Sequence, residues 1–319
     1  MAKYKVLLAE SRYPHHNEEQ AVLDRIGAEM IVERSDKEDR IAELVADADG
    51  LIVNLAPITA KVVAAMKKCK CVSRYGVGYD NVDAAALKAR GIFLANVPDY
   101  CGEDVSDHAI ALLLDCVRKV SRKDRLVRAG QWNLTGVQEV YRVAGKTMGF
   151  VGYGMIARVL HRKLSGFNLG RFLIADPFVS PDTAKKAGTE LVGLPTLCRE
   201  ADFISVHAPL LPSTRGMIGA AQFALMKKTA ILVNTSRGPL VDEAALVEAL
   251  KAGRIACAGL DVFAAEPLPA ASELRQLDNV TLTDHAGWYS VESMVELKTK
   301  AAQNIAETLT AGRPKYAVK

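Results

Sequence analysis

The sequence has few cysteines, and no two of them have the C-x-x-C spacing of a zinc or redox motif. Six cysteines are spread over 319 residues, and the only closely spaced pair is Cys69 and Cys71. Sparse cysteines in a long chain are typical of reduced thiols in a cytosol, and they give no support to a metal site. We therefore expect a cytoplasmic protein without a bound metal.

Long apolar runs are also missing. The longest run, Ala109–Leu114, is far shorter than the ~20 residues of a membrane-spanning helix. The apolar run near the N-terminus, Val6–Ala9, is too short for the core of a signal peptide. We expect neither a membrane span nor a secretory leader.

The chain has no strong excess of either charge. Lys and Arg number 41 against 37 Asp and Glu, which gives a formal net charge of +4, and no long block of like charges occurs. Scattered basic residues are typical of solvated faces, so we expect no nucleic-acid partner. With 50% hydrophobic residues the chain is an ordinary globular one, and its length exceeds that at which one core keeps growing. Two domains are expected.

What the sequence does contain is an alternation of short apolar runs and helical patterns. Uninterrupted apolar runs predict strands buried on both faces, and helices between them predict parallel sheets in a doubly wound α/β architecture. The predicted strands are Lys5–Ala9, Gly50–Val53, Cys71–Ser73, Ile92–Asn96, Thr147–Gly152, Arg171–Asp176, Phe203–Ala208, Ala230–Ser236, Cys257–Val262 and Val280–Thr283.

The strongest helical pattern covers residues 102–132. Apolar side chains recur there at helical spacing, for example at Val105, Ala109 and Leu112. A turn precedes the segment and a polar loop follows it up to Ala144. We predict one long helix and a domain change near Cys101.

A glycine-rich turn follows the predicted strand that begins at Thr147, and a predicted helix begins directly after the turn. Its pattern is Gly152-x-Gly154-x-x-Ala157, which taken alone is also typical of a tight turn. Between a strand and a helix it directs backbone N–H groups and the positive end of the helix dipole toward a pyrophosphate. The last position needs only a small side chain, so the alanine is compatible with a dinucleotide site.

The next predicted strand ends at Asp176, at the spacing where a dinucleotide site has an acid for the ribose 2′-hydroxyl. A carboxylate there would repel a 2′-phosphate, so the sequence predicts NAD rather than NADP. The alternative role for Asp176 is that of a turn residue before Pro177.

Three polar residues follow later strands: Arg237, Glu266 and His285. A histidine suits proton transfer near neutral pH. A carboxylate beside it favours the imidazolium form and orients the ring, and an arginine offers a planar fork to a substrate carboxylate. Each residue alone is more typical of a cap, a turn or a packed ring. Together, downstream of a nucleotide turn, they indicate a catalytic site.

These segments, in this order, resemble the D-isomer-specific 2-hydroxyacid dehydrogenases, the NAD-dependent family that includes phosphoglycerate dehydrogenase. The similarity runs from SRYGVGYDNVD through the glycine turn, HAPLLPSTRGMI and NTSRGPLVDE to the C-terminal helix. It implies a Rossmann domain (102–286) inserted into a flavodoxin-like substrate domain (1–101 with 287–319). It also implies an active site in the cleft between domains and a homodimer built partly on the helix after Cys101.

The resemblance assigns roles residue by residue. Arg237 matches the substrate-binding arginine, Glu266 the partner of the histidine, and His285 the general acid/base. On the substrate side it implies Arg74, backbone contacts from Val77 and Gly78, and Trp288. The expected cofactor contacts are Gly152, Tyr153, Gly154, Met155, Ile156, Asp176, Pro177, His207, Ala208, Pro209, Thr214, Thr235, Ser236, Arg237, Asp261, His285 and Gly287.

The substrate stays open among phosphoglycerate, hydroxypyruvate, glyoxylate and longer 2-oxo acids. Trp288 favours a slim or apolar substrate, whereas Arg74 resembles the arginine of the phosphoglycerate and corepressor branches. The segment HAGWYS is similar to the C-terminal-binding protein corepressors. One alternative is therefore an NAD(H)-sensing binding protein. A phosphite oxidiser on the same scaffold is a second alternative. A formate oxidiser is disfavoured, because that branch of the family has glutamine where this chain has Glu266.

Overall fold

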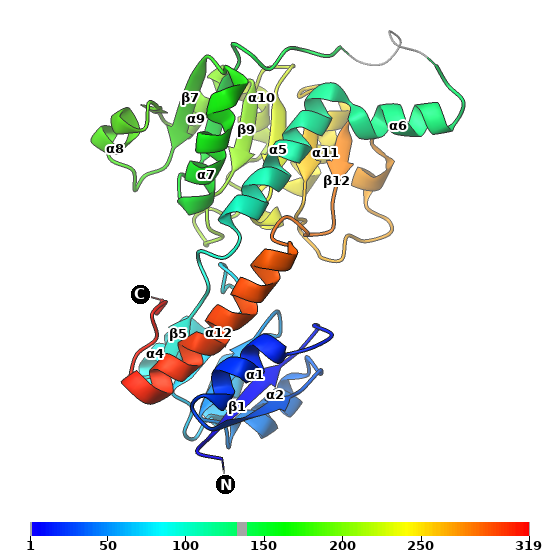
Figure 1. Ribbon diagram of the computed structural model, residues 1–319. Helices are drawn as coiled ribbons and strands as arrows, with labels where there is room; N and C mark the ends of the chain where they lie inside the picture. The colour runs from blue at the N-terminus through cyan, green and yellow to red at the C-terminus, as the bar shows by residue number, and fades with distance from the viewer. Residues whose placement is uncertain (1, 133–138, 319) are drawn as a thin grey trace. The chain divides into compact units, whose positions relative to one another are not determined.

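The computed structural model describes residues 2–132 and 139–318. The chain forms two compact units (Figure 1), which we call unit 1 (Met1–Cys101 with Ser290–Lys319) and unit 2 (Gly102–Tyr289). Unit 2 is thus inserted into the sequence of unit 1. The chain re-enters unit 1 at Ser290, whereas the sequence placed this boundary at residue 287.

Unit 1 is a five-stranded parallel sheet with helices on its faces. Its elements are β1 Tyr4–Ala9, α1 Asn17–Asp24, β2 Ala28–Val32, α2 Glu38–Val45, β3 Gly50–Val53, α3 Ala60–Ala65, β4 Cys71–Arg74, α4 Ala84–Ala89, β5 Phe93–Ala95 and α12 Val291–Ala311.

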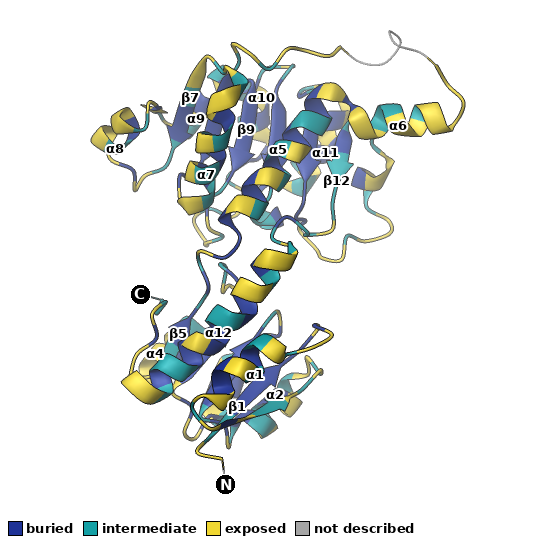
Figure 2. Ribbon diagram, viewed as in Figure 1, coloured by how far each residue is buried: buried dark blue, intermediate teal, exposed yellow. Residues whose placement is uncertain are grey.

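The strand order of unit 1 is β2-β1-β3-β4-β5, with every pair parallel. This is the flavodoxin-like order, as predicted. The long helix α12 packs against β3, β4 and α1, and it lies so close that a Cβ on Gly50 would stand 2.7 Å from Ile305. All residues of β3 and β4 are buried, and so are the last four residues of β1, which Figure 2 draws in dark blue. Burial on both faces explains the continuous apolar runs of β1 and β3.

Unit 2 contains a seven-stranded parallel sheet. Its elements are α5 Gly102–Arg118, α6 Val120–Arg128, β6 Thr147–Val151, α7 Met155–Leu164, η1 Ser165–Phe167, β7 Arg171–Ala175, α8 Pro181–Lys186, β8 Glu190–Leu191, α9 Leu194–Glu200, β9 Phe203–Val206, α10 Ala220–Leu225, β10 Ile231–Asn234, η2 Gly238–Leu240, α11 Glu243–Lys251, β11 Cys257–Leu260, η3 Glu273–Gln276 and β12 Val280–Leu282.

The strand order of unit 2 is β12-β11-β10-β9-β6-β7-β8. The order reverses between β6 and β9, which is the switch point of a Rossmann fold, where ligands bind outside the carboxyl ends of the strands. Helix α5 packs against α7 and against β10 and β11, and α9 packs against β6 and β7. The predicted α/β class with a Rossmann domain is confirmed.

The structure differs from the sequence predictions in three elements. Strands β2 and β8 were not predicted, and both lie at sheet edges. The predicted helix over 102–132 is broken at Lys119, which adopts a left-handed backbone (φ 60°). The Asp115 carboxylate accepts the Ser121 N–H at 2.7 Å just after the break, and α6 has no buried residue. The polar loop expected after this helix falls partly on residues 133–138, outside the described residues.

Among the described residues, no helix combines the length and the apolarity needed to cross a bilayer.

Candidate active site

The residues predicted for unit 2 lie at one edge of its sheet. Because all strands are parallel, their carboxyl ends meet at this edge. The glycine turn follows β6, His207 follows β9, Arg237 follows β10, Glu266 follows β11 and His285 follows β12. The fold therefore gathers residues from five strands at the place where such sheets bind ligands.

The glycine turn has the geometry that its sequence predicts. Gly152 has a φ of 85°, and a Cβ there would stand 2.7 Å from the backbone nitrogen of Ala208, so only glycine fits. Gly154 is the N-cap of α7 and supplies no side-chain cap, which leaves the N–H groups of the first turn for a ligand. Ala157 is completely buried, consistent with the need for a small side chain.

Asp176 holds the glycine turn in place. One carboxylate oxygen accepts the Tyr153 N–H at 2.8 Å, and the other accepts the Phe178 N–H at 2.8 Å. The Tyr153 hydroxyl lies 2.6 Å from Nδ1 of His161, and its ring is buried. Asp176 thus lies directly beside the turn, where a dinucleotide ribose would be bound.

Two buried polar atoms at the same edge have no hydrogen-bond partner among the described residues. They are Oγ1 of Thr235 and Nδ1 of His207. Desolvation lowers the pKa of His207 to about 4, so its ring is neutral near pH 7, and its Nε2 lies 2.8 Å from Oγ of Ser205. Buried polar atoms without partners are rare in native proteins, and a cofactor bound at this edge would supply partners for both. Together with the open N-terminus of α7, they fit a dinucleotide.

The remaining predicted cofactor contacts surround these groups. Oγ of Ser236 donates to Val206 O at 3.0 Å, and Oγ1 of Thr214 donates to Pro209 O at 2.7 Å. Met155 and Ile156 form the start of α7, and Pro177 is exposed beside Asp176. These side chains line the edge of the sheet without occupying the turn.

His285 and Glu266 form a direct pair. Nδ1 of His285 lies 2.7 Å from Oε2 of Glu266, and Oε1 of Glu266 accepts the Phe263 N–H at 2.9 Å. Burial opposes ionisation of Glu266, but these hydrogen bonds and the nearby Arg237 lower its pKa below the usual value. His285 has a left-handed backbone (φ 59°), which is uncommon for a non-glycine residue. The pair fixes the ring through Nδ1.

Arg237 lies next to this pair. Its guanidinium donates to Ser236 O at 2.9 Å, and its own carbonyl accepts Nδ2 of Asn234 at 2.9 Å. Because Arg237 lies near enough to Glu266 to lower its pKa, the structure brings together the three residues predicted for catalysis. Trp288 packs edge-on against Tyr289, with ring centroids 5.7 Å apart.

Asp261 anchors the segment that carries His285. Its carboxylate accepts the N–H groups of Ala286 and Gly287, each at 2.9 Å, and the hydroxyl of Thr283 at 2.6 Å. Nε2 of His108 lies 3.2 Å away. Burial alone would raise the pKa of Asp261, but these contacts outweigh it and hold the pKa at about 2. Through these hydrogen bonds Asp261 holds the loop that carries His285.

In unit 1, the predicted substrate residues follow β4. Arg74 is the last residue of the strand and is 8% exposed. Its guanidinium packs against Gly76, where an added Cβ would lie 1.9 Å from it. Gly76 has a φ of 126°, and Val77 and Gly78 continue the turn, with Nδ2 of Asn96 donating to Val77 O at 2.7 Å. Arg74 thus packs directly against this turn.

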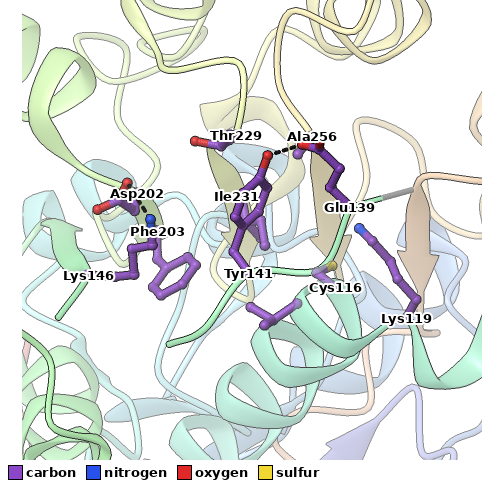
Figure 3. Close-up of a pocket in the computed structure, with 11 residues that line it drawn as sticks. Cys116, Lys119, Glu139, Tyr141, Lys146, Asp202, Phe203, Thr229, Ile231 and Ala256 are labelled. Atoms are coloured by element: carbon purple, nitrogen blue, oxygen red, sulfur yellow. Dashed lines mark hydrogen bonds and ion pairs between the residues drawn. The ribbon is translucent and has the colours of Figure 1, made fainter. Parts of the chain in front are cut away.

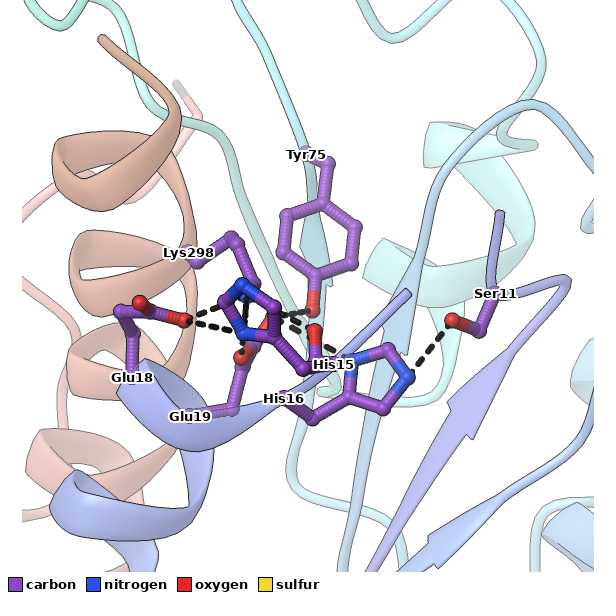
Figure 4. Close-up of polar contacts among 7 residues, drawn as sticks. All are labelled: Ser11, His15, His16, Glu18, Glu19, Tyr75 and Lys298. Carbon is purple, nitrogen blue, oxygen red and sulfur yellow. Dashed lines mark hydrogen bonds and ion pairs between the residues drawn. The ribbon is translucent and has the colours of Figure 1, made fainter. Parts of the chain in front are cut away.

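A buried polar network holds the residue before this turn, and the sequence gave no indication of it. The Tyr75 hydroxyl donates to Glu19 at 2.6 Å. Lys298 of α12 is 1% exposed, bonds Glu18 and lies 3.5 Å from Glu19 (Figure 4). The set also includes Ser11, His15 and His16. Burial and the adjacent Glu19 raise the pKa of Tyr75 well above its usual value, so the hydroxyl stays protonated and remains a donor.

A small cavity of unit 2 lies away from the predicted residues. It measures about 20 Å³ and is lined by Cys116, Lys119, Asp202 and Ile231, among others (Figure 3). Asp202 directly precedes β9 and Ile231 begins β10, so this cavity is at the amino edge of the sheet. Its volume is enough for about one water molecule.

The fold and the residues at the carboxyl edge define a class of protein. Nucleotide-dependent dehydrogenases combine a Rossmann sheet and a dinucleotide turn with a histidine fixed by a carboxylate and a neighbouring arginine. Residues 110–287 match the family model "D-isomer specific 2-hydroxyacid dehydrogenase, NAD binding domain". The chain belongs to the D-isomer specific 2-hydroxyacid dehydrogenase family, so it is an NAD(P)-dependent oxidoreductase acting on 2-hydroxy acids.

Two curated relatives illustrate the similarity in sequence. The chain is 43% identical over 275 residues to a glyoxylate reductase of Korarchaeum cryptofilum, covering 85% of this chain and 81% of the relative. It is 36% identical over 298 residues to a D-3-phosphoglycerate dehydrogenase of Methanocaldococcus jannaschii, covering 93% of this chain but only 56% of that protein.

Solved structures agree in fold over the whole chain. An NADPH-dependent glyoxylate/hydroxypyruvate reductase of Sinorhizobium meliloti, in complex with NADP and malonate, is 28% identical, with a TM-score of 0.87, and the match covers 99% of this chain and 97% of the other. These findings do not favour the corepressor-like sensor or the phosphite oxidiser.

Proposed function

We propose that this protein catalyses the reversible reduction of a small 2-oxo acid to a D-2-hydroxy acid with NADH. The observation that carries the proposal is the 2.7 Å contact between His285 and Glu266. It lies at the sheet edge that also bears the dinucleotide turn and Arg237. Unit 2 would bind the cofactor, and unit 1 would bind part of the substrate.

The cofactor would be held by residues of unit 2. The N–H groups at the start of α7 would bind the pyrophosphate, and Asp176 would accept the ribose 2′-hydroxyl. Thr235 and His207 offer the two unpartnered polar atoms. When bound, the nicotinamide supplies hydride to the 2-carbon of the oxo acid, or accepts it from the hydroxy acid. Because Asp176 carries a charge, we propose NAD over NADP.

His285 would move the proton. Glu266 fixes Nδ1, so Nε2 is the atom that would donate to the carbonyl oxygen in reduction and accept from the hydroxyl in oxidation. The ionised Glu266 stabilises the charged ring that forms in oxidation. Asp261 would hold His285 in position by accepting the N–H groups of Ala286 and Gly287.

Arg237 would bind the substrate carboxylate and stabilise negative charge on the carbonyl oxygen. In unit 1, the N–H groups of Val77 and Gly78 would bind the carboxylate as an anion nest. Arg74 packs against the same turn at Gly76. Trp288 would limit the width of the substrate. The bond from Tyr75 to Glu19 would fix the residue that precedes this turn.

The test is NADH oxidation by the purified protein with glyoxylate, hydroxypyruvate, 3-phosphohydroxypyruvate and a longer apolar 2-oxo acid. Oxidation with at least one of them is the expected result. Tight NADH binding without reduction of any 2-oxo acid would contradict the proposal. Omitting the 2-oxo acid controls for background oxidation of NADH.

We also propose a cytoplasmic homodimer. All six cysteines are free thiols, as in a reducing compartment. Helix α6 buries none of its residues, and Val120 and Val127 are 58% and 52% exposed. Trp132, a few residues later, is 81% exposed. Exposed apolar side chains gathered on one segment are typical of an interface. Sedimentation of a monomer at micromolar concentration would contradict the dimer.

A further inference from the structure

Two turns lie side by side at the carboxyl edge of the unit 1 sheet. One follows β3 and the other follows β4, and the last residues of the two strands, Val53 and Arg74, are paired in the sheet. The Tyr75 N–H donates to Val53 O at 2.9 Å. Both turns therefore face the region where a ligand of this unit would bind.

The turn after β4 is open to an anion. Among the hydrogen bonds of the described residues, none is donated by the N–H groups of Val77 or Gly78. Both residues are half-buried. Adjacent N–H groups of this kind form an anion-binding concavity, which matches one carboxylate.

The turn after β3 is already filled by an anion of the protein itself. Oε2 of Glu10 accepts the N–H groups of Leu55 and Ala56 at 2.5 and 2.9 Å. Glu10 is 2% exposed and has a left-handed backbone with φ 54°, so the surrounding structure fixes it firmly. Arg12 bonds the other carboxylate oxygen, and this pair leaves no net positive charge.

The carbonyl groups of the same turn are also occupied. Nδ2 of Asn81 donates to Asn54 O at 3.0 Å and to Ala56 O at 2.8 Å. The side chain left at the surface is that of Leu55, which is 46% exposed. The turn after β3 thus presents an apolar side chain over a buried carboxylate that already pairs with Arg12, a surface that favours an uncharged group over a second anion.

We infer that this protein acts on 2-oxo acids that carry a single anionic group, the carboxylate, and that it discriminates against phosphorylated ones. Glu10 and Leu55 are the residues that determine this specificity. The inference rests on the proposed function and narrows its substrate class. Glyoxylate and hydroxypyruvate satisfy it, and 3-phosphohydroxypyruvate does not.

The experiment compares kcat/KM of the wild-type protein for hydroxypyruvate and 3-phosphohydroxypyruvate, which differ only in the phosphate. A phosphate placed against an apolar side chain loses water without gaining a partner, so hydroxypyruvate should be preferred by about 100-fold or more. A preference for the phosphorylated acid, or equal efficiency, overturns the inference and leaves the proposed function intact. If none of these acids, glyoxylate and the longer apolar 2-oxo acid is reduced, the proposed function fails and the inference fails with it.

Two variants test the residues themselves. Leu55→Lys adds a cation at an exposed position and should reduce the preference about 10-fold. Glu10→Gln removes the charge and keeps an acceptor, and it should act in the same direction if it folds. The matched control is Val32→Lys. Val32 is 40% exposed and ends β2, which β1 separates from β3. The preference of this variant for hydroxypyruvate over the phosphorylated acid should therefore stay at the wild-type value. An unchanged ratio in Leu55→Lys would contradict the role of this turn.

Discussion

Nδ1 of His285 lies 2.7 Å from Oε2 of Glu266, although the two residues follow different strands, β12 and β11. This contact fixes the ring and determines which nitrogen is left for proton transfer. The proposed mechanism depends on it more than on any other distance in the structure.

Replacing His285 by alanine should reduce kcat by roughly two to four orders of magnitude, the usual contribution of general acid/base catalysis. NADH binding, measured by fluorescence titration, should be retained because the dinucleotide turn is untouched. Val32→Ala is the control, since Val32 is 40% exposed at the end of β2 and its replacement should leave kcat unchanged. Wild-type turnover in His285→Ala would remove the assignment.

Glu266→Gln tests the partner of the histidine. The amide keeps the size of the side chain but loses the charge that stabilises the imidazolium, so we expect kcat to fall about tenfold or more. The lowered pKa of Glu266 means that the wild-type carboxylate stays charged throughout the neutral range. The pH profile of kcat should therefore change in the variant. An identical profile would show that the carboxylate only packs against the ring.

Asp176→Asn should weaken discrimination against NADP. The amide oxygen can still accept a backbone N–H, while the charge that would repel a 2′-phosphate is removed. The ratio of kcat/KM for NADH and NADPH measures the effect. Asp182→Asn is the matched control, because Asp182 is an exposed acid in the first turn of α8. An unchanged ratio in Asp176→Asn would place the ribose-binding acid elsewhere.

Asp261→Asn should lower the free energy of unfolding in a pH-dependent way. The folded-state pKa is about 2, against an ordinary value of 3.8. The charged form therefore stabilises the fold above pH ~4, and this stabilisation is lost as the pH falls toward 2. The shift corresponds to about 2 kcal/mol at neutral pH. Urea unfolding at several pH values measures it, and a difference between wild type and variant that does not change with pH would contradict the prediction.

Lys298→Met should destabilise unit 1 by about 3 kcal/mol, because it leaves Glu18 and Glu19 without their buried cation. Adding Glu18→Gln and Glu19→Gln should restore part of the loss. Lys61, whose side chain is 60% exposed and pairs with the exposed Asp39 in unit 1, provides the control, and Lys61→Met should change stability by less than about 1 kcal/mol. Equal effects of the two lysine substitutions in urea unfolding would argue against a buried network.

The sequence alone determined the interior of the fold. All ten predicted strands are present, because strands buried on both faces require continuous apolar runs that can be read directly. The edge strands β2 and β8 escaped prediction. In β2 only Ala28 is fully buried, and β8 has two residues, so neither carries that pattern. The long helix was predicted as continuous because the left-handed turn at Lys119 leaves no signature in the apolar spacing.

The sequence also determined which residue types stand at the strand ends, and hence the dinucleotide turn and the three residues proposed for catalysis. Only the tertiary structure decided their contacts. The Lys298 to Glu18 bond joins residues 280 positions apart, and the Glu10 carboxylate fills a turn 45 positions away. Local periodicity records how far each residue is buried, whereas the pairing of distant polar groups depends on the path of the whole chain.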